Sequence, residues 1–125
     1  MEMVKLTSGL LTEKYTTVWY EKEFQFNAPH HFEVCRADVV AEGGKGRTLA
    51  EIHFQEGPIK ETGVNGVNNE DLINMVICRL EHFQNTPYKC RENALAITKL
   101  EEALLWLRKR TMDREAREVE GTHVV

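Results

Sequence analysis

The sequence has 125 residues, of which 42% are hydrophobic and 29% are charged, and its formal net charge at pH 7 is -4. This length suits one folded domain, and the composition excludes collagen-like, low-complexity and disulfide-scaffold proteins. The acidic balance also argues against a binder of DNA or RNA polymers, which needs a broad basic surface.

The first half of the chain has the pattern of strands and turns. Residues 16–20 are β-branched or aromatic, as strands prefer. Residues 48–55 alternate apolar and polar side chains with the period of two that is typical of a half-buried antiparallel strand. The glycine-rich stretch 42–47 is a strong turn signal. We therefore predict a hairpin of residues 31–40 and 48–55 around this turn, and a further short strand at 59–61.

The second half has the pattern of two helices. Residues 68–71 offer capping side chains followed by acidic residues, as in a first helical turn. Apolar residues then recur at helical spacing up to about Phe83. The stretch 85–87, which ends in proline, interrupts this pattern. A second helix is predicted from about residue 88 or 90 to about residue 114.

These elements predict an α+β fold in a single domain, residues 1–125. Residues 1–66 are expected to form an antiparallel β-sheet, and residues 67–125 a two-helix hairpin with a C-terminal tail. The apolar positions of the second helix cover more than half of its circumference, which is more than one helical partner can bury. We expect a second subunit to cover the excess, Trp106 included, so that the protein is a homo-oligomer.

The sequence indicates neither a membrane span nor a secretory leader. No apolar run approaches the roughly 18 residues of a membrane helix. The first residues of the chain include acids and lack an apolar core. The three cysteines, Cys35, Cys78 and Cys90, are odd in number and widely spaced, which favours reduced thiols. We therefore expect a cytoplasmic protein that does not contact membranes.

Patterns for catalysis and metal binding are weak. Ser8 is the only serine and does not sit in a nucleophile elbow, and nothing in the sequence places a histidine beside a cysteine. His30 and His31 are adjacent, so on a strand they point to opposite faces. Since His53 and His82 stand alone, the spacing predicts no metal site and no cofactor. His30 is kept as a candidate for facing a ligand.

A cluster of cations near the end of the second helix is the best candidate for a binding site. Five of them lie between residues 108 and 117, namely Arg108, Lys109, Arg110, Arg114 and Arg117. Arginine forks bind phosphate groups through paired hydrogen bonds, so the cluster suits a small anion. Cations also collect at helix C-termini because they complement the helix dipole. Both interpretations remain open.

Phe83 and Asn93 are the residue types that would complete a nucleotide site. A phenyl ring stacks on a base, and a side-chain amide forms hydrogen bonds with a base or ribose. The alternative for Phe83 is a place in the core of the hairpin. The alternative for Asn93 is a cap at the start of the second helix.

Several short motifs, in this order along the chain, resemble one family. They are His30–Val34, Phe54–Glu61, Gly63–Val67, Asn69–Leu72, Cys90–Asn93, Leu100–Leu104, and Arg117 with Val119–His123. Over about residues 28–125 the chain resembles the first type of phage Thoeris anti-defence protein, a sponge for cyclic ADP-ribose signals. Its helical hairpin is similar to that of a phage anti-CBASS sponge.

The resemblance implies a protein without enzymatic activity in the cytoplasm of the infected bacterial host. It would bind glycocyclic ADP-ribose isomers, which TIR-domain immune proteins make, and leave them intact. It would assemble as a hexamer built of dimers, and in some members a second class of pocket takes cyclic oligonucleotides. Two other functions stay open: a cyclic-nucleotide hydrolase, and a structural or adaptor protein that uses the helical hairpin.

The resemblance also implies roles for individual residues. By position, Phe83 would stack on adenine, Asn93 would form hydrogen bonds with the base or ribose, and Arg110 would hold the diphosphate. The further candidates for ligand contact are Lys109, Arg114, Arg117 and His30.

Overall fold

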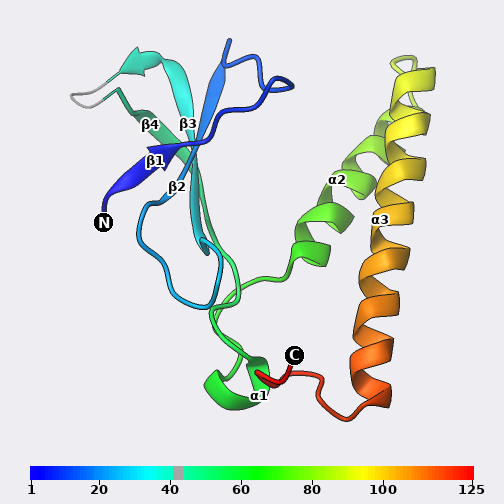
Figure 1. Cartoon of the computed structure of the whole chain (residues 1–125). Coiled ribbons are helices and arrows are strands. Elements are labelled where there is room, and N and C mark those ends of the chain that lie inside the picture. Colours follow the sequence, from blue (N-terminus) through cyan, green and yellow to red (C-terminus); the bar gives the residue numbers. More distant parts are fainter. Residues whose placement is uncertain (41–43) are drawn as a thin grey trace. The chain divides into compact units, whose positions relative to one another are not determined.

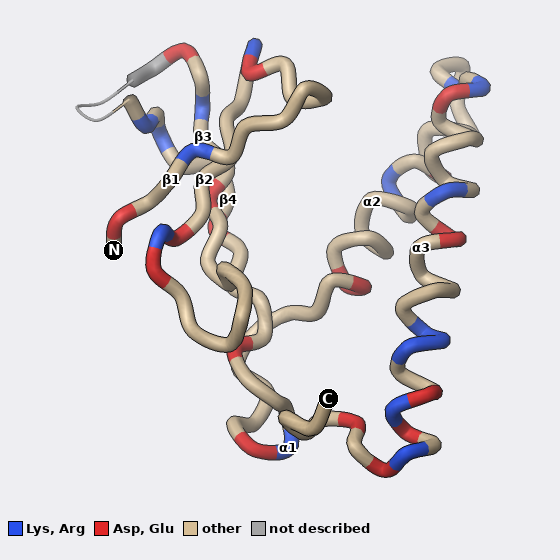
Figure 2. Tube along the Cα trace, viewed as in Figure 1, with Lys and Arg blue, Asp and Glu red and all other residues tan. Residues whose placement is uncertain are grey.

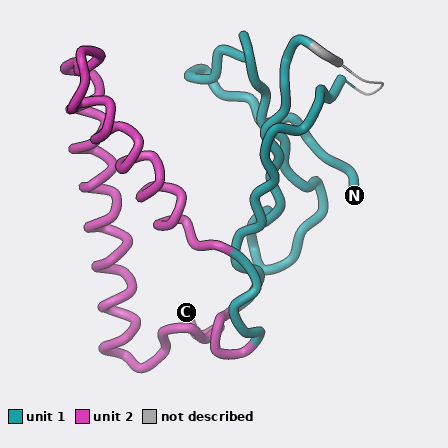
Figure 3. Tube along the Cα trace, turned by 180° about the vertical axis from the view of Figure 1, so that it is seen from behind, with its two compact units in different colours: residues 1–57, 62–66 teal, residues 58–61, 67–125 magenta. Residues whose placement is uncertain are grey.

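The computed structural model describes residues 1–40 and 44–125. The chain divides into two compact units, which Figure 3 distinguishes by colour. The β unit comprises residues 1–57 and 62–66, and the helical unit comprises residues 58–61 and 67–125. An N-terminal antiparallel sheet is followed by C-terminal helices, which confirms the predicted α+β class.

The β unit is built on a four-stranded antiparallel sheet in the order β1-β2-β3-β4 (Figure 1). The strands are β1 Met3–Lys5, β2 Thr16–Glu21, β3 His31–Val40 and β4 Gly46–His53. The strand predicted at 16–20 and the predicted hairpin are confirmed as β2 and as the β3–β4 pair. Sequence patterns missed β1. The glycine-rich turn predicted over 42–47 lies partly outside the described residues, since 41–43 are not among them.

One face of β2 supplies much of the small interior of the β unit. Thr17, Trp19 and Glu21 are buried at alternate positions, as the period of a strand requires. The indole Nε1 of Trp19 donates to Thr17 Oγ1 at 2.9 Å, so its polar atom is satisfied. Cys35 on β3 is fully buried. The buried carboxylate of Glu21 matters for the chemistry of the unit, because burial of a charge requires partners.

The short strand predicted at 59–61 is wrong, because this segment is helix α1, Ile59–Thr62. Gly57 has a φ of 81°, a value at which L side chains are strained, and this turns the chain after β4. Pro58 then enters the turn with its φ already suited to a helix and accepts a hydrogen bond from the Glu61 amide. The glycine–proline pair therefore starts a helix as well as ending a strand.

The helical unit is dominated by α2, Asn69–Gln84, and α3, Arg91–Ala116, which pack against each other as a hairpin. Both predicted helices are confirmed, and α3 continues two residues beyond the expected end. At the start of α2, the carboxylate of Asp71 accepts a hydrogen bond from the Asn68 amide at 2.8 Å. Among the described residues, no helix combines the length and the apolar character needed to cross a bilayer.

The hairpin leaves much apolar surface uncovered within one chain. Ile77 is the only hydrophobic residue buried in the described part of the helical unit. On α3, Leu105 is 71% exposed and Trp106 is 64% exposed. With 26 residues against 16, α3 is about 39 Å long and α2 about 24 Å long, so α2 cannot cover all of α3. The second subunit expected on this surface stays a prediction.

Candidate functional site

The turn between the helices brings the predicted aromatic and amide groups to one end of the hairpin. Phe83 lies in the last turn of α2 and is 38% exposed, and Asn93 lies half-buried in the first turn of α3. The Gln84 side chain ties the two helices together, because it donates to Cys90 O at 2.9 Å and accepts from Cys90 N at 3.0 Å. The N-cap of α3 is Cys90, so Asn93 is not the cap. We call this region the aromatic end.

Sequence analysis missed one residue at the aromatic end. The guanidinium of Arg79 lies over the ring of Phe83, 5.2 Å from its centroid. Arg79 and Phe83 are four residues apart and so lie on the same face of α2, and this spacing is the sequence signal that indicates their contact. A guanidinium in this position is attracted by the negative face of the aromatic ring.

The predicted cations lie toward the other end of α3, where charges of both signs alternate (Figure 2). Arg108 pairs with Glu115 at 3.3 Å, and Lys109 pairs with Asp113 at 3.4 Å. The Arg110 side chain is exposed, and among the described residues it makes no ion pair or hydrogen bond. Its guanidinium therefore keeps all its donors available for an anion. We call this region the cationic end.

Arg114 and Arg117 hold the C-terminal tail. Arg114 Nη2 lies 2.8–3.1 Å from three tail carbonyl oxygens, those of Val119, Thr122 and Val124. Arg117 Nη1 donates to Val125 O at 3.0 Å. One terminal nitrogen of each guanidinium thus contacts tail oxygen atoms, which orders the tail beside the cationic end. Contact of Arg114 and Arg117 with a ligand stays a prediction.

The tail is also fastened to α1. The Lys60 amide donates to Gly121 O at 2.8 Å, and the Glu61 carboxylate accepts from the backbone N and Nδ1 of His123 at 2.8 and 2.9 Å. The hydrogen bond from the His123 side chain is the main cause that lowers the pKa of Glu61 below its ordinary value. These hydrogen bonds, which join Glu61 to a residue 62 positions later in the sequence, form one clip.

The two ends of α3 are too far apart to share a small ligand within one chain. Asn93 and Arg110 are 17 positions apart on one continuous helix. At 1.5 Å of rise per residue this is about 25 Å. The structure therefore places Phe83 and Asn93 at the same end of the hairpin and Arg110 toward the other.

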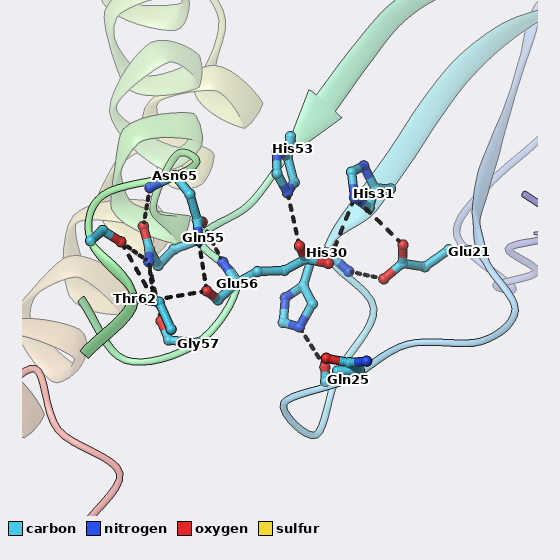
Figure 4. Close-up of polar contacts among 11 residues, drawn as sticks. Glu21, Gln25, His30, His31, His53, Gln55, Glu56, Gly57, Thr62 and Asn65 are labelled. Atoms are coloured by element: carbon cyan, nitrogen blue, oxygen red, sulfur yellow. Dashed lines mark hydrogen bonds and ion pairs between the residues drawn. The ribbon is translucent and has the colours of Figure 1, made fainter. Parts of the chain in front are cut away.

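His30 belongs to the β unit and is only 7% exposed. Its imidazole Nε2 lies 2.7 Å from Gln25 O, and its amide donates to Glu21 Oε1 at 3.1 Å (Figure 4). These contacts give His30 a structural task in the loop before β3.

A cluster that sequence spacing did not indicate lies next to His30. Donor atoms of His31, His53 and Glu56 lie within 4.8 Å of one another, in an arrangement that could hold a metal ion. Strand pairing brings these residues together, so no local motif marks them.

The structure also corrects the expectation that no histidine accompanies a cysteine. Cys78 Sγ lies 3.8 Å from Nδ1 of His82, one helical turn later. The same Nδ1 lies 2.9 Å from Cys78 O, which requires a proton on that nitrogen. A nitrogen that donates to a carbonyl cannot also accept the thiol proton, so this pair is not arranged as a nucleophile and its base.

Comparison with known proteins gives two matches. Residues 47–112 match the family model described as "Acb2/Tad1, hairpin domain". A curated protein, "Thoeris anti-defense 1" of Bacillus phage SBSphiJ7, is 50% identical over 140 aligned positions that cover 97% of this chain and 99% of that protein. The family match includes both Phe83 and Asn93 at the aromatic end and Arg110 at the cationic end.

Proposed function

Because this chain belongs to the Thoeris anti-defence 1 family and carries the Acb2/Tad1 hairpin, we propose that it sequesters cyclic ADP-ribose-type signalling nucleotides during phage infection. Its ligands would be glycocyclic ADP-ribose isomers made by TIR-domain immune proteins in the host cytoplasm. The protein holds these molecules intact and so keeps them from the immune effector. No cofactor enters this scheme.

The separation of the two ends of α3 carries the structural part of the proposal. One chain supplies Phe83 and Asn93 at one end and Arg110 about 25 Å away at the other. A two-fold pairing of hairpins in opposite directions sets the aromatic end of each subunit beside the cationic end of its partner. The exposed Leu105 and Trp106 offer apolar surface for such a pairing. We propose that dimers of this kind assemble further into a hexamer.

Each group in the composite pocket has a chemical task. The adenine stacks on Phe83, whose ring already has the Arg79 guanidinium against it. Asn93 offers both a donor and an acceptor to the base or ribose. Arg110 of the partner subunit binds the diphosphate through charge-assisted hydrogen bonds.

The remaining predicted residues act less directly in this scheme. Lys109 adds positive potential, partly offset by its pairing with Asp113. Arg114 and Arg117 order the tail that borders Arg110. His30 is buried in the β unit and takes no part.

Sequestration and hydrolysis are separated by recovery of the ligand. The protein is incubated with a glycocyclic ADP-ribose isomer, the free ligand is measured, and the complex is then denatured by heat. Depletion followed by release of the intact molecule is expected. A degraded product would contradict the proposal and favour a hydrolase, and an absence of depletion would favour the adaptor function. Cyclic dinucleotides and trinucleotides in the same assay test for the second class of pocket.

Neighbouring arginines on α3 provide a matched control. Arg110→Ala should weaken binding by about 1.5–3 kcal/mol, because it removes a charged donor from the diphosphate. Arg108→Ala should change binding by less than about 0.5 kcal/mol, because Arg108 is already paired with Glu115 at the surface. Calorimetry with equal losses for both variants would show that Arg110 has been given the wrong role.

A further inference from the structure

Two histidines and a carboxylate converge at the end of the β3–β4 hairpin. His31 and His53 are direct partners in the register of β3 and β4, and their rings stack with centroids 4.1 Å apart and planes 10° apart. Glu56 Oε1 lies 3.6 Å from His31 Nε2, and Glu56 Oε2 lies 3.5 Å from His53 Nε2 (Figure 4). All three groups belong to the β unit.

A second carboxylate faces the same imidazole from β2. Glu21 Oε2 lies 3.8 Å from His31 Nε2, while Glu21 Oε1 accepts the amide hydrogen bond of His30. Glu21 is only 3% exposed. A carboxylate buried this deeply needs a nearby positive charge to offset the loss of hydration.

The backbone of Glu56 is fixed in a way that directs its side chain toward the histidines. Asn65 accepts a hydrogen bond from the Glu56 amide and donates one to Glu56 O, both at 2.8 Å. Gln55, the preceding residue, donates to Gly57 O and Gly63 O and accepts from the Asn65 amide. This network positions the Glu56 carboxylate without using either of its oxygen atoms.

One nitrogen atom in the cluster makes no hydrogen bond within the described part of the chain. His53 Nε2 is buried, and among the described residues it has the Glu56 carboxylate 3.5 Å away in an ion-pair arrangement but no hydrogen-bond partner. Buried imidazole nitrogens normally form a hydrogen bond. A cation bound between this nitrogen and the carboxylate would satisfy both.

We propose that His31 Nε2, His53 Nε2 and Glu56 bind a divalent transition metal ion, Zn²⁺ by preference, with water as the fourth ligand. Glu21 lies beside His31 as a second carboxylate that offsets the charge of the ion. Two imidazoles and a carboxylate are a donor set that zinc accepts. In a tetrahedral site with bonds of 2.0–2.1 Å, neighbouring donors are about 3.3 Å apart. The distances of 3.5 and 3.6 Å from the Glu56 oxygens to the two imidazoles are close to that value before any ion is added.

Binding requires one local rearrangement. Two parallel stacked rings cannot aim both nitrogen lone pairs at a single point, so the imidazoles have to splay apart from their 10° angle. A hollow of about 460 Å³ borders both rings and gives them room to turn and the ion a route of entry. The ion would then join β3, β4 and the segment after β4, in a unit whose hydrophobic core is small. Its main effect is therefore expected on stability.

The test uses the full chain with Cys78→Ser and Cys90→Ser, because exposed thiols bind zinc strongly on their own. Protein stripped with a chelator is titrated with Zn²⁺ by calorimetry and with Co²⁺ by visible spectroscopy. We expect one ion per chain, a higher melting temperature, and Co²⁺ d–d bands without a thiolate charge-transfer band. His53→Gln should weaken binding by about tenfold or more. The matched control His82→Gln should leave it unchanged.

Two results would overturn the proposal. One is Zn²⁺ binding that does not saturate or does not raise the melting temperature. The other is binding that His53→Gln leaves unchanged or His82→Gln abolishes. Circular dichroism verifies that His53→Gln is folded. If that variant unfolds, the Co²⁺ spectrum of the parent protein decides, because imidazole and carboxylate ligands give tetrahedral d–d bands and an empty site gives only the aqueous ion.

Discussion

Two variants that each bind weakly should recover tight binding when they are combined, if every pocket is shared between subunits. Phe83→Ala removes the stacking ring from the aromatic end of a chain, and Arg110→Ala removes the guanidinium from its cationic end. The gap of about 25 Å along α3 means that these defects damage different pockets of a pair. Each variant alone should lose about 1–3 kcal/mol of binding free energy at every pocket.

The extent of recovery follows from random assembly. When equal amounts of the two variants are co-expressed, a pocket is intact only if an Arg110→Ala chain supplies the ring and a Phe83→Ala chain supplies the guanidinium. Each condition is met by chance about half of the time, so about one quarter of the pockets should regain the original affinity.

The assay is calorimetric counting of tight sites per chain with a glycocyclic ADP-ribose isomer. A second mixture, Phe83→Ala with Asn93→Ala, provides the control, because both changes lie at the aromatic end and no combination of these chains restores a complete pocket. Recovery of about one quarter in the first mixture and none in the second is expected. No recovery in the first mixture, or equal recovery in both, would refute the shared pocket.

Three further changes test the helical unit. Arg114→Ala should lower the free energy of unfolding by about 1.5–3 kcal/mol, because it removes a charged donor from three carbonyls. Arg117→Ala removes a single hydrogen bond and should lower that free energy by less. Chemical denaturation compares the two variants, and equal losses would contradict the larger role of Arg114 in holding the tail. Because the pKa of Glu61 is lowered in the folded protein, its contribution to the clip with α1 is present above its ordinary value of 4.5 and is lost as the pH falls below it. The protection factor of the Lys60 amide, which compares its exchange with the intrinsic rate at the same pH, should therefore fall in acid, and Glu61→Gln should flatten that response. A parent protection profile without such a step would argue against the clip. Trp106→Glu should shift sedimentation toward the monomer, and an unchanged mass would exclude this surface from the interface.

Local periodicity was enough to predict the elements whose pattern is long. β3, β4, α2 and α3 all carry regular alternation or helical spacing, and each lies close to its predicted range. β1 has three residues, too few to show a period. The segment 59–61 begins with the β-branched Ile59, directly after the Gly57–Pro58 pair that ends the strand pattern, and a strand was therefore expected there. The helix-starting geometry of Pro58 outweighs the strand preference of this residue.

The histidine cluster shows why tertiary pairing limits prediction of a site. Counting outward from the glycine-rich turn, Cys35 is paired with Thr48, and an uninterrupted ladder would place His31 opposite Ile52. The register shifts between Val34 and Cys35, and His31 therefore meets His53. One extra residue in a strand moves every later side chain to the other face. The sequence contains no local sign of this shift.

The tail limited prediction for a similar reason. The type and spacing of Arg114 and Arg117 fit an anion as well as a carbonyl, and their contacts with the tail depend on the return of the tail to α1. Such a return joins residues that are far apart in sequence, so it leaves no periodic signal. The aromatic end was easier to predict, because a turn of few residues connects Phe83 to Asn93.

Because α3 is one continuous helix, its length fixes the distance between Asn93 and Arg110. A residue inserted between Asn93 and Arg110 would move the guanidinium by 1.5 Å and swing it by about 100° around the axis. In a two-fold pair this displacement occurs in both helices, so in each pocket the guanidinium would be shifted relative to the aromatic end of the partner. In the proposed pair, the length of α3 therefore has to match the size of the nucleotide that the aromatic end and the cationic end bind.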